Sequence, residues 1–488
     1  MSASASSSPA PDLPRPERGD TPQGWDPDRL LHALAREAPQ RLLHVREVPA
    51  RRARPAGWPE WVEPTVVAAL TGSGIARPWS HQVQVADLAH AGRHVVVSTG
   101  TASGKSLGFL LPVLSDVVAG SREPSGRGAT ALYLSPTKAL ATDQLSRVAG
   151  LALPGVRAAV YDGDTPAEER RWVREHANVV LTNPDLLHHS LLPGHERWAA
   201  FLRGLRYVVV DECHVYKGVF GAHVAAVLRR LRRVAGRYRA SPTFALASAT
   251  VAEPEEHAAR LLGMPVRAVT RDGSPRAATS FALWEPPLLS APDGQPKRAS
   301  TLTETGELLA ACVREGVQTL AFARSRAAVE VVARIARERL PDSDEGTVAA
   351  YRGGYLPEER RELERALRNR HLRGVSATNA LELGIDVSGL DVVLLAGWPG
   401  TLASLWQQAG RAGRTGRRSL AVLVAADDPL DTYVVHHPDS IFARGVEATV
   451  VDPDNVHVLA PHLAAAAAER NCSRKAGAVC RSGSPPTR

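Results

Sequence analysis

Apolar runs and amphipathic stretches alternate along most of the chain. Short runs such as "RHVVVSTG" and "LRYVVVDE" are apolar at nearly every strand position, whereas the stretches that follow, such as "KSLGFLLPVLSDVVAG", have the length of helices. A strand that is apolar at every position is buried on both faces, which is typical of parallel sheets. The pattern therefore predicts an α/β protein whose parallel sheets carry helices on both faces.

The alternation occurs twice, and a stretch rich in proline, glycine and serine at about 271–300 interrupts it. Such composition is typical of a linker between domains. We therefore expect two α/β domains of similar size in tandem, with "SFALWEP" as the first strand of the second. The expected segments are a disordered tail at 1–24, a helical segment at 25–77, α/β domains at 78–272 and 273–460, and a further tail at 461–488.

Composition narrows the class of protein only slightly. The net charge is +8, and only five of the 59 basic residues are lysine. An excess of arginine suits phosphate binding, but it is equally typical of GC-rich genomes, so charge alone decides little. The first twenty residues lack the apolar core of a signal peptide, and no run of eighteen apolar residues occurs. We expect a cytoplasmic protein with no membrane partner.

The four cysteines do not form a recognisable pattern. Cys213, Cys312, Cys472 and Cys480 are widely spaced, and no CxxC occurs. This excludes a disulfide framework, and two cysteines eight positions apart cannot complete a tetrahedral zinc site by themselves. No zinc is therefore expected in this chain.

The stretch "VVVSTGTASGKSLGF" places a glycine, a lysine and a serine between a strand and a helix. Backbone N–H groups at such a helix start cradle phosphate, Lys105 would reach the β- and γ-phosphates, and the Ser106 hydroxyl would hold Mg²⁺. The match is imperfect because Thr99 occupies the first glycine position of the phosphate loop. ATP and Mg²⁺ are the cofactors expected, with these residues binding them: Thr101, Ala102, Ser103, Gly104, Lys105 and Ser106.

Two adjacent carboxylates end the buried strand "YVVVDE". Without a phosphate loop, such a pair is more often solvated in a turn or caps a helix. With the loop, Asp211 would hold Mg²⁺ through water, and Glu212 would orient and deprotonate the attacking water. The carboxyl ends of parallel strands are where α/β sheets bind ligands, so the acids would face the cation rather than the core.

The second domain carries "LWQQAGRAGRTGRRS". The spacing of Gln407, Arg411 and Arg414 would place all three on one face of a helix. Arginines supplied to the γ-phosphate from another domain accelerate hydrolysis by roughly 10³- to 10⁵-fold. The alternative is a basic, solvated helix end.

Taken with their order, these motifs resemble the superfamily-two DExH helicases from about residue 40 to about residue 468. The motifs are "SHQ", "TGTASGKS", "SPTKALATDQ", "YDGDT", "TNPD", "DECH", "SAT", "FARSR", "YRGGYLPEERRELE", "TNALELGID" and "QQAGRAGRTGR". Several are similar to those of the MrfA/YprA-like DNA repair helicases, bacterial relatives of the fungal RecQ-like repair helicases. Helicases in general usually have another glycine at Ala102, and the alanine is a feature of this subgroup.

The resemblance implies two RecA-like domains, an ATP-driven 3′ to 5′ motor on single-stranded and duplex-junction DNA, and a role in DNA repair at the nucleoid. It implies that Gln82 reads adenine and that Gly384 and Asp386 approach the nucleotide. Coupling between the ATP site and DNA is implied for His214, Ser248 and Thr250. The implied DNA track is Pro136, Thr137, Lys138, Thr182, Asn183, Arg352, Thr378 and Asn379.

Simpler interpretations stay open for several residues. Thr182 and Asn183 could cap the helix that starts near Asp185. A paired His188 and His189 is expected to pack or to lie at the surface. Four arginines of one predicted helix are expected to form a solvated face: Arg229, Arg230, Arg232 and Arg233.

The last segment departs from the family pattern, since apolar periodicity ends at about Arg470 and the family usually continues into a zinc-binding domain with four cysteines. We expect a truncated or non-family tail and a helix at 461–470 that has lost its docking partner. Two other functions remain open. One is an RNA helicase, and the other is a nucleic-acid-binding fragment with ATPase activity but no unwinding.

Overall fold

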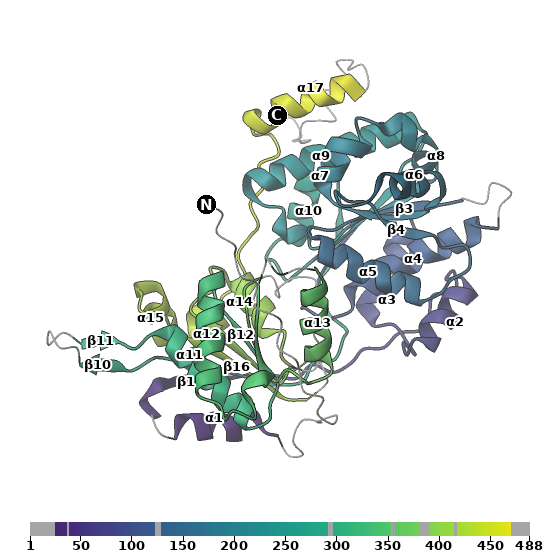
Figure 1. Ribbon diagram of the computed structural model, residues 1–488. Helices are drawn as coiled ribbons and strands as arrows, with labels where there is room; N and C mark the ends of the chain where they lie inside the picture. The colour runs from purple at the N-terminus through teal and green to yellow at the C-terminus, as the bar shows by residue number, and fades with distance from the viewer. Residues whose placement is uncertain are drawn as a thin grey trace, which may run out of the picture. The chain divides into compact units, whose positions relative to one another are not determined.

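The computed structural model describes residues 25–36, 39–122, 128–290, 296–352, 355, 357–379, 390–413 and 417–469. They fall into two compact units, each made from two separate parts of the chain. Unit 1 comprises Met1–Arg51 and Arg276–Arg444, and unit 2 comprises Arg52–Pro275 and Gly445–Arg488. Figure 1 shows the elements of each unit.

Unit 2 contains a parallel sheet of seven described strands in the order β4-β5-β3-β6-β7-β2-β8. Its strands are β2 (Val95–Ser98), β3 (Thr130–Leu134), β4 (Ala158–Val160), β5 (Val179–Thr182), β6 (Leu205–Val210), β7 (Thr243–Ser248) and β8 (Arg267–Val269). Its helices are α2 (Pro64–Gly72), α3 (Ser80–His90), α4 (Lys105–Gly120), α5 (Lys138–Gly150), α6 (Ala167–His176), α7 (Pro184–Leu186), α8 (Ala199–Arg203), α9 (Gly218–Arg237), α10 (Pro254–Leu262) and α17 (Val456–Glu469), with short turns η2 (Leu187–Leu191), η3 (His195–Trp198) and η4 (Cys213–Val215).

Unit 1 contains a second sheet of seven described strands in the order β1-β9-β16-β15-β12-β14-β13, in which only β1 runs antiparallel to its neighbour. Its strands are β1 (Leu42–Val48), β9 (Thr279–Trp284), β12 (Thr319–Phe322), β13 (Val348–Tyr351), β14 (Gly374–Ala377), β15 (Val392–Ala396) and β16 (Ser419–Val424), and β10 (Leu288–Ser290) pairs separately with β11 (Pro296–Arg298). Its helices are α1 (Pro27–Ala35), α11 (Thr301–Arg314), α12 (Arg326–Glu338), α13 (Pro357–Arg368), α14 (Leu402–Ala409), α15 (Pro429–His436) and α16 (Asp439–Phe442), with turns η1 (Pro39–Arg41) and η5 (Glu345–Thr347).

Each sheet has a buried core on both faces. Along β2, Val96 belongs to one apolar cluster of unit 2, while Val95 and Val97 belong to the other. Neighbouring positions of a strand point to opposite faces, so a strand that is apolar throughout contributes to both cores. The same arrangement recurs in unit 1 around β15. The prediction of two α/β domains, each with helices on both faces of its sheet, is confirmed.

Local sequence sets where several helices begin. Proline stands at the first position of α1, α2, α10 and α15, where its missing N–H costs no hydrogen bond. The side chains of Thr137, Ser325 and Thr401 accept backbone N–H groups at the starts of α5, α12 and α14. Each such cap stabilises a helix by about 1 kcal/mol.

The units divide the chain differently from the domains expected from the sequence. The expected helical segment at 25–77 is split, because α1 and β1 belong to unit 1 and α2 belongs to unit 2. Strand β1 pairs with β9 along its length, and Arg41 contacts Glu304 of α11 at 2.8 Å. Residues 445–460, expected in the second α/β domain, belong to unit 2.

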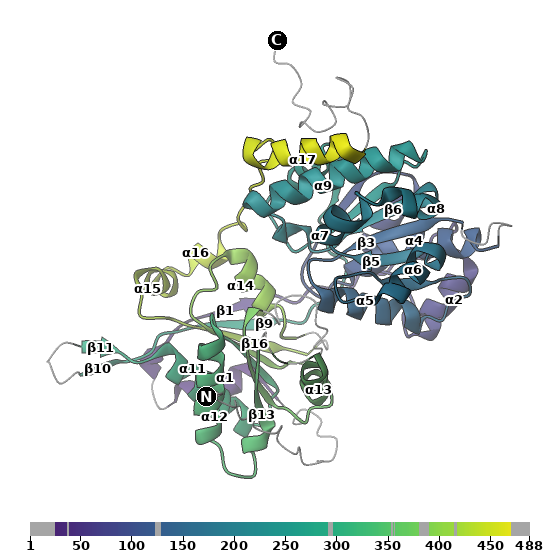
Figure 2. The same cartoon turned by 45° about the horizontal axis from the view of Figure 1, so that its top comes forward.

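Helix α17 packs along α9, so the expectation that it has no docking partner is wrong (Figure 2). The expectation of a solvated arginine face on α9 is also wrong for three of its four members. Arg229 and Arg230 are 1 % exposed and Arg233 is 8 % exposed, and only Arg232 is not fully buried. The guanidinium groups of Arg230 and Arg233 bond to Glu469 and to the Ala466 carbonyl of α17.

Candidate active site

The predicted phosphate loop joins β2 to α4. Gly104 takes a left-handed conformation with φ at +73°, and a Cβ atom there would lie 2.6 Å from Nε2 of Gln82. Only glycine fits this position. Ala102 is also left-handed, with φ at +60°. The Lys105 ammonium donates to the carbonyls of Thr99 and Gly100, at 3.1 Å each, so the loop folds around its own lysine.

The order of strands brings the predicted motifs to one edge of the sheet. Strand β7 lies between β6, which ends at the acid pair, and β2, which ends at the phosphate loop. Because all three strands are parallel, their carboxyl ends meet at the same edge. The "SAT" residues follow β7 and therefore lie between the loop and the acids.

The acid pair occupies the end of β6. Asp211 is 6 % exposed; its Oδ2 accepts from the Tyr133 hydroxyl and its Oδ1 from the Glu212 amide at 2.9 Å. Burial, together with the neighbouring charge of Glu212, raises the pKa of Asp211 to about 7. The Glu212 backbone is left-handed, with φ at +46°.

One oxygen of Glu212 is buried without a donor. Oε2 lies 3.3 Å from Nδ1 of His214 but makes no hydrogen bond to it. The reason is that Nδ1 already accepts the Ala249 amide at 3.2 Å and so carries no proton of its own. A buried carboxylate oxygen without a donor is a place for a cation or a water molecule.

The residues present fit Mg²⁺ and a nucleotide. Oxygen ligands are those Mg²⁺ prefers, and this edge of the sheet supplies a hydroxyl from Ser106 and two crowded carboxylates that a cation would stabilise. The Ser106 hydroxyl is held by Nε2 of Gln144 at 3.3 Å. The left-handed turn at Gly104 leaves backbone N–H groups at the start of α4 for phosphate.

Gln82 contacts the phosphate loop directly. Its Oε1 accepts the Trp79 amide at 2.7 Å, and its Nε2 donates to the Gly104 carbonyl at 2.9 Å. The side chain is 4 % exposed. The amide therefore braces the loop in this structure, and contact with adenine stays a prediction.

The residues expected to couple the site to DNA surround the end of β7. His214 bonds to Ala249, Ser248 is buried, and Thr250 is exposed. Sequence reasoning missed Ser98, whose hydroxyl donates to the Ala249 carbonyl at 2.8 Å and accepts the Val251 amide at 3.4 Å. Its place at the end of the strand before the loop is legible in the sequence, but the segment that it contacts, about 150 positions later, is not.

The expected DNA-track residues of unit 2 follow the carboxyl ends of β3 and β5. Thr137 caps α5, and Lys138 extends to Asp164 at 2.5 Å. Asn183 accepts the Leu186 amide at 2.9 Å, so it does cap α7 as the simpler interpretation had it. Thr182 is 3 % exposed and does not act as the cap.

In unit 1 the expected track residues also follow strand ends. Arg352 follows β13; it contacts Glu330 at 2.6 Å and lies over the Tyr355 ring. Thr378 and Asn379 follow β14. These residues, like Pro136 after β3 of unit 2, follow the carboxyl end of a strand. That is the edge at which parallel sheets bind ligands.

Gln407 and Arg411 are buried in unit 1, at 4 % and 5 % exposure. The prediction that they share a helical face is wrong, because α14 ends at Ala409 and Ala412 forms a bridge with Leu390. Arg414, Gly384 and Asp386 lie outside the described residues.

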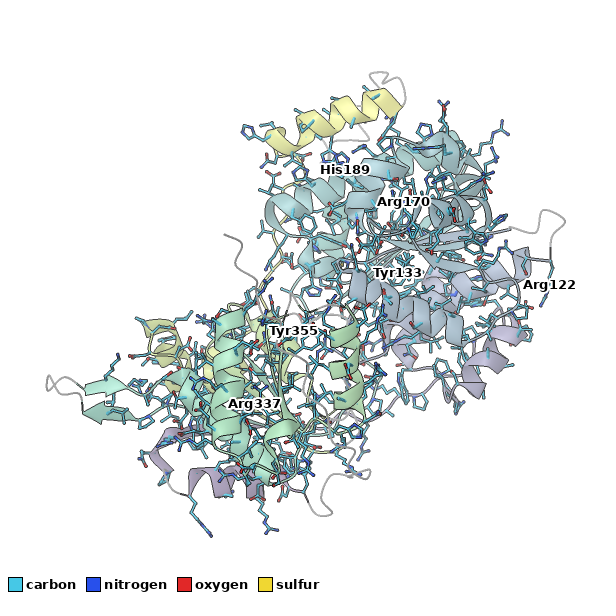
Figure 3. All side chains as sticks on the ribbon, viewed as in Figure 1. Arg122, Tyr133, Arg170, His189, Arg337 and Tyr355 are labelled. Carbon is cyan, nitrogen blue, oxygen red and sulfur yellow. The ribbon has the colours of Figure 1, made fainter. Side chains whose placement is uncertain are left out.

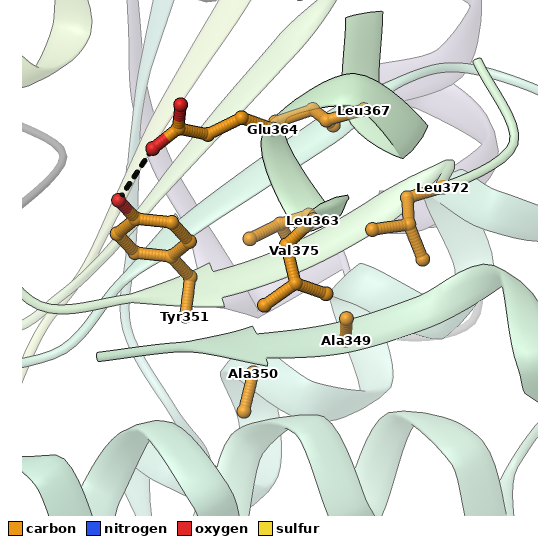
Figure 4. Close-up of a pocket in the computed structure, with 8 residues that line it drawn as sticks. All are labelled: Ala349, Ala350, Tyr351, Leu363, Glu364, Leu367, Leu372 and Val375. Atoms are coloured by element: carbon orange, nitrogen blue, oxygen red, sulfur yellow. Dashed lines mark hydrogen bonds between the residues drawn. The ribbon is translucent and has the colours of Figure 1, made fainter. Parts of the chain in front are cut away.

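Two hollows in the described residues lie away from the loop. One, of about 10 Å³, is enclosed by β13, β14 and α13 beneath the hydrogen bond from Tyr351 to Glu364, and it is barely large enough for one water molecule (Figure 4). The other, of about 400 Å³, is lined by residues near the starts of β6 and β7. Neither is at the edge that carries the motifs.

Two further searches cover the described residues alone. Within them, no helix combines the length and apolarity needed to cross a membrane. The same residues hold no cluster of three or more His, Cys, Asp or Glu side chains suited to a metal ion. Cys213 and Cys312 are buried free thiols, and Cys472 and Cys480 lie outside the described range.

Comparison with known families agrees with this geometry. The DEAD/DEAH box helicase model matches residues 79–258, and the helicase conserved C-terminal domain model matches residues 301–416. The chain belongs to the superfamily-two helicases. The resemblance drawn from its motifs is confirmed.

Individual relatives narrow the position within that superfamily. The helicase YprA of Bacillus subtilis is 41 % identical over 88 % of this chain and 57 % of its own length. HRQ1 of Saccharomyces cerevisiae is 37 % identical over 88 % of this chain and 40 % of its own length. A crystal structure of the DUF1998 helicase MrfA bound to DNA has a TM-score of 0.84 at 39 % identity, covering 91 % of this chain and 59 % of that one. The chain thus spans about half the length of these relatives.

Proposed function

We propose that this chain is a DNA-dependent ATPase motor that moves 3′ to 5′ on single-stranded DNA and opens duplex junctions, in DNA repair. The observation that carries the proposal is the meeting of the phosphate loop and the acid pair at one edge of the sheet of unit 2. Similarity to YprA and HRQ1, which are named as ATP-dependent helicases, and to MrfA, solved with DNA, supports it. The expected location is the cytoplasm, at the nucleoid.

In this proposal the chain binds ATP through the start of α4. Lys105 exchanges the carbonyls of Thr99 and Gly100 for phosphate oxygens, and the amides that follow Gly104 hold the phosphate chain. Ser106 and Asp211 would hold Mg²⁺, which neutralises charge that develops on the phosphates. Residues 101–103 complete the loop, and Gln82 would read adenine.

Glu212 is the proposed general base. Its Oε2, which lacks a donor, would orient the attacking water and take its proton. Gln407, Arg411 and Arg414 would be supplied from unit 1 to stabilise charge on the γ-phosphate, and Gly384 and Asp386 would approach the nucleotide. Hydrolysis would then depend on closure of the two units around ATP.

DNA would be held by its phosphates rather than its bases. The proposed contacts are Pro136, Thr137, Lys138, Thr182, Asn183, Arg352, Thr378 and Asn379, with His214, Ser248 and Thr250 linking them to the ATP site. Phosphate contacts carry no sequence information, so binding should show little sequence preference and a strong dependence on salt.

The test is steady-state ATP hydrolysis by the purified chain with no nucleic acid, with single-stranded DNA and with single-stranded RNA. We expect stimulation by DNA, and a loss of about 10²-fold or more in the Glu212→Gln variant, because the general base is removed. The matched control is Glu256→Gln, which changes an exposed glutamate of α10 and should leave hydrolysis unchanged.

Each other outcome has a definite meaning. Stimulation by RNA alone would contradict the DNA motor and favour an RNA-dependent motor. A folded chain that no nucleic acid stimulates would contradict the motor proposal for this chain. Full activity in Glu212→Gln would contradict the role given to that carboxylate.

A further inference from the structure

A buried tyrosine on β3 contacts the first of the two acids. The hydroxyl of Tyr133 donates to Oδ2 of Asp211, 78 positions later in the chain. Tyr133 is 2 % exposed, and its ring packs edge-on against Phe109 of α4 with centroids 5.8 Å apart. Figure 3 labels the side chain within the sheet of unit 2.

The register of the sheet produces this contact. Tyr133 lies opposite Val209 in the parallel pairing of β3 with β6. Paired residues share a face, and so do residues two apart on one strand, so Tyr133 and Asp211 are on the same face. The tyrosine side chain is long enough to reach the carboxylate just beyond the last pair of the ladder.

The tyrosine fixes the orientation of the Asp211 carboxylate. One oxygen accepts from Tyr133, and the other accepts the backbone amide of Glu212 at 2.9 Å. With one donor on each oxygen, the carboxylate cannot rotate freely about its bond to Cβ. Each oxygen still has a second lone pair for another partner.

Packing alone does not require the hydroxyl. The side chains on this face of β3 and β6 include Ala131 and Val209, and a phenylalanine ring would fill the same space beside Phe109. A buried hydroxyl costs free energy unless it is hydrogen-bonded, so its bond to a carboxylate is the reason it can be there.

We propose that Tyr133 is a positioning residue for the magnesium ion of the nucleotide, because it holds the Asp211 carboxylate in the orientation that receives the hydrated cation. The inference rests on the proposed function, since the ion follows from the ATP site. Tyr133 itself touches neither ion nor nucleotide. Partners of this kind that orient metal-binding carboxylates typically change metal affinity by about 10- to 100-fold.

The sheet supplies a matched control. Tyr207 of β6 is 1 % exposed, and its hydroxyl donates to Oδ2 of Asp116 on α4 at 2.6 Å. It thus forms a second tyrosine–aspartate pair, with Tyr207 in the same apolar cluster and Asp116 half-buried beside Arg206, and Asp116 is no part of the site. Tyr133→Phe and Tyr207→Phe each delete one hydroxyl and keep the ring.

The experiment measures binding of a fluorescent, non-hydrolysable ATP analogue while the Mg²⁺ concentration is varied. For Tyr133→Phe we expect the Mg²⁺ concentration at half-maximal binding to rise about tenfold. For Tyr207→Phe we expect no change. Without Mg²⁺, in excess chelator, all three proteins should bind the analogue equally, and thermal unfolding should show both variants folded.

Hydrolysis gives an independent readout. The Mg²⁺ requirement for ATP hydrolysis should rise in Tyr133→Phe, and the maximal rate should largely recover at saturating Mg²⁺. An unchanged Mg²⁺ requirement would overturn the inference. So would an equal loss of binding with and without Mg²⁺, or an equal effect of Tyr207→Phe, because each would reduce Tyr133 to a packing role.

The inference and the proposed function fail in different ways. A wild-type chain that binds no ATP analogue at any Mg²⁺ concentration would refute the ATP site itself. A wild-type chain that binds and hydrolyses ATP, with Tyr133→Phe identical to it, would refute the role of Tyr133 alone.

Discussion

At the scale of single residues, two strained backbone positions lie at the candidate site. Among the described residues, five other than glycine have a positive φ, and two of them are Ala102 in the phosphate loop and Glu212 of the acid pair. Each costs on the order of 1 kcal/mol or more and persists only where other contacts hold it. At Glu212, the hydrogen bond from its backbone N–H to the Asp211 carboxylate is such a contact.

Ser98 permits a prediction at the same scale. Its hydroxyl joins the end of β2 to the Ala249 and Val251 backbone, so it connects the strand of the phosphate loop to the "SAT" segment. In Ser98→Ala we expect nucleotide affinity within about twofold of wild type, because the hydrogen bonds of the loop remain. We expect stimulation of hydrolysis by DNA to fall about tenfold, which corresponds to roughly one lost hydrogen bond.

The comparison for that variant is Ser115→Ala. Ser115 is a buried serine of α4 whose hydroxyl accepts the Glu63 amide at 3.2 Å, away from the "SAT" segment. Stopped-flow nucleotide binding and steady-state hydrolysis with DNA would be measured for both. If both variants keep the wild-type stimulation factor, Ser98 does not couple the two segments.

Some residues of the candidate site could be predicted from the sequence, and others could not. Lys105, Asp211 and Glu212 could be identified because their chemistry and their places after apolar runs are both legible in the sequence. Tyr133 and Ser98 could not, because their roles depend on which strand lies beside which. In the sequence, Tyr133 is one more apolar position of "ATALYLSP".

At the scale of elements, α9 and α17 form a buried polar interface. Arg230 donates to Nδ1 of His188 at 2.7 Å and to Nδ1 of His462 at 2.9 Å, and it also binds the Glu469 carboxylate. Nε2 of His462 in turn contacts Nδ1 of His223 at 3.0 Å. Because Nδ1 of His462 accepts from Arg230, the ring proton of His462 lies on Nε2, which donates it to Nδ1 of His223.

This interface predicts loss of stability in acid. Burial, with Arg230 as the next cause, lowers the pKa of His462 to about 4, and burial also lowers the pKa of His188. The unfolded chain, with a histidine pKa near 6.5, therefore binds protons that the folded chain does not between about pH 6.5 and pH 4. The free energy of unfolding of unit 2 should fall as the pH is lowered through that window.

The charged and titratable groups that face His462 are Arg230 and His223 from α9 and His188 from η2. Denaturant unfolding at several pH values would measure the effect. His462→Phe should flatten the dependence, and His457→Phe, at an exposed site of the same helix, should leave it unchanged. An identical slope in all three proteins would exclude His462 as the cause.

Helices and strands could be predicted where the local hydrophobic pattern defines them. Features that depend on tertiary contacts could not. The alternation of strands and helices is local, so the α/β class followed directly from it. The arginine face of α9 was misread because periodicity shows which residues share a face but not what covers it. Arg230 and Arg233 are covered by α17, more than 200 positions later, and Arg229 bonds to the Arg260 carbonyl of α10. Helix α14 ends at Ala409 with Gly410 as its C-cap, and Ala412 then forms a bridge with Leu390, a long-range contact that no local pattern reveals.

At the scale of the whole molecule, the chain builds each unit from parts that are far apart in sequence. Residues 445–469 leave unit 1 and return to unit 2, where the Val450 carbonyl accepts the Gly218 amide at 2.9 Å, just after the "DECH" segment. A Cβ atom at Gly221 would lie 2.8 Å from Val451, so this glycine permits the close approach. The returning segment is an integral part of unit 2.

Removing the ion pair that anchors this segment should destabilise unit 2. Arg230 and Glu469 have side chains 1 % and 3 % exposed, so Glu469→Gln leaves a buried guanidinium without its counter-charge. We expect a loss of about 3 kcal/mol in the free energy of unfolding, measured by urea denaturation. Glu256→Gln breaks the exposed pair with Arg260 and should cost less than about 0.5 kcal/mol. Equal losses would show that α17 contributes little.

The pairing of β1 with β9 has a consequence for the order of events during synthesis. Leu42 pairs with Trp284, so β1 leaves the ribosome about 240 residues before its partner exists. At typical rates of about 5 to 20 residues per second, that interval is roughly 10 to 50 seconds. For all of it the residues of β1 are without their partner strand, and strand residues with unpaired N–H and C=O groups are the kind of surface at which chains aggregate.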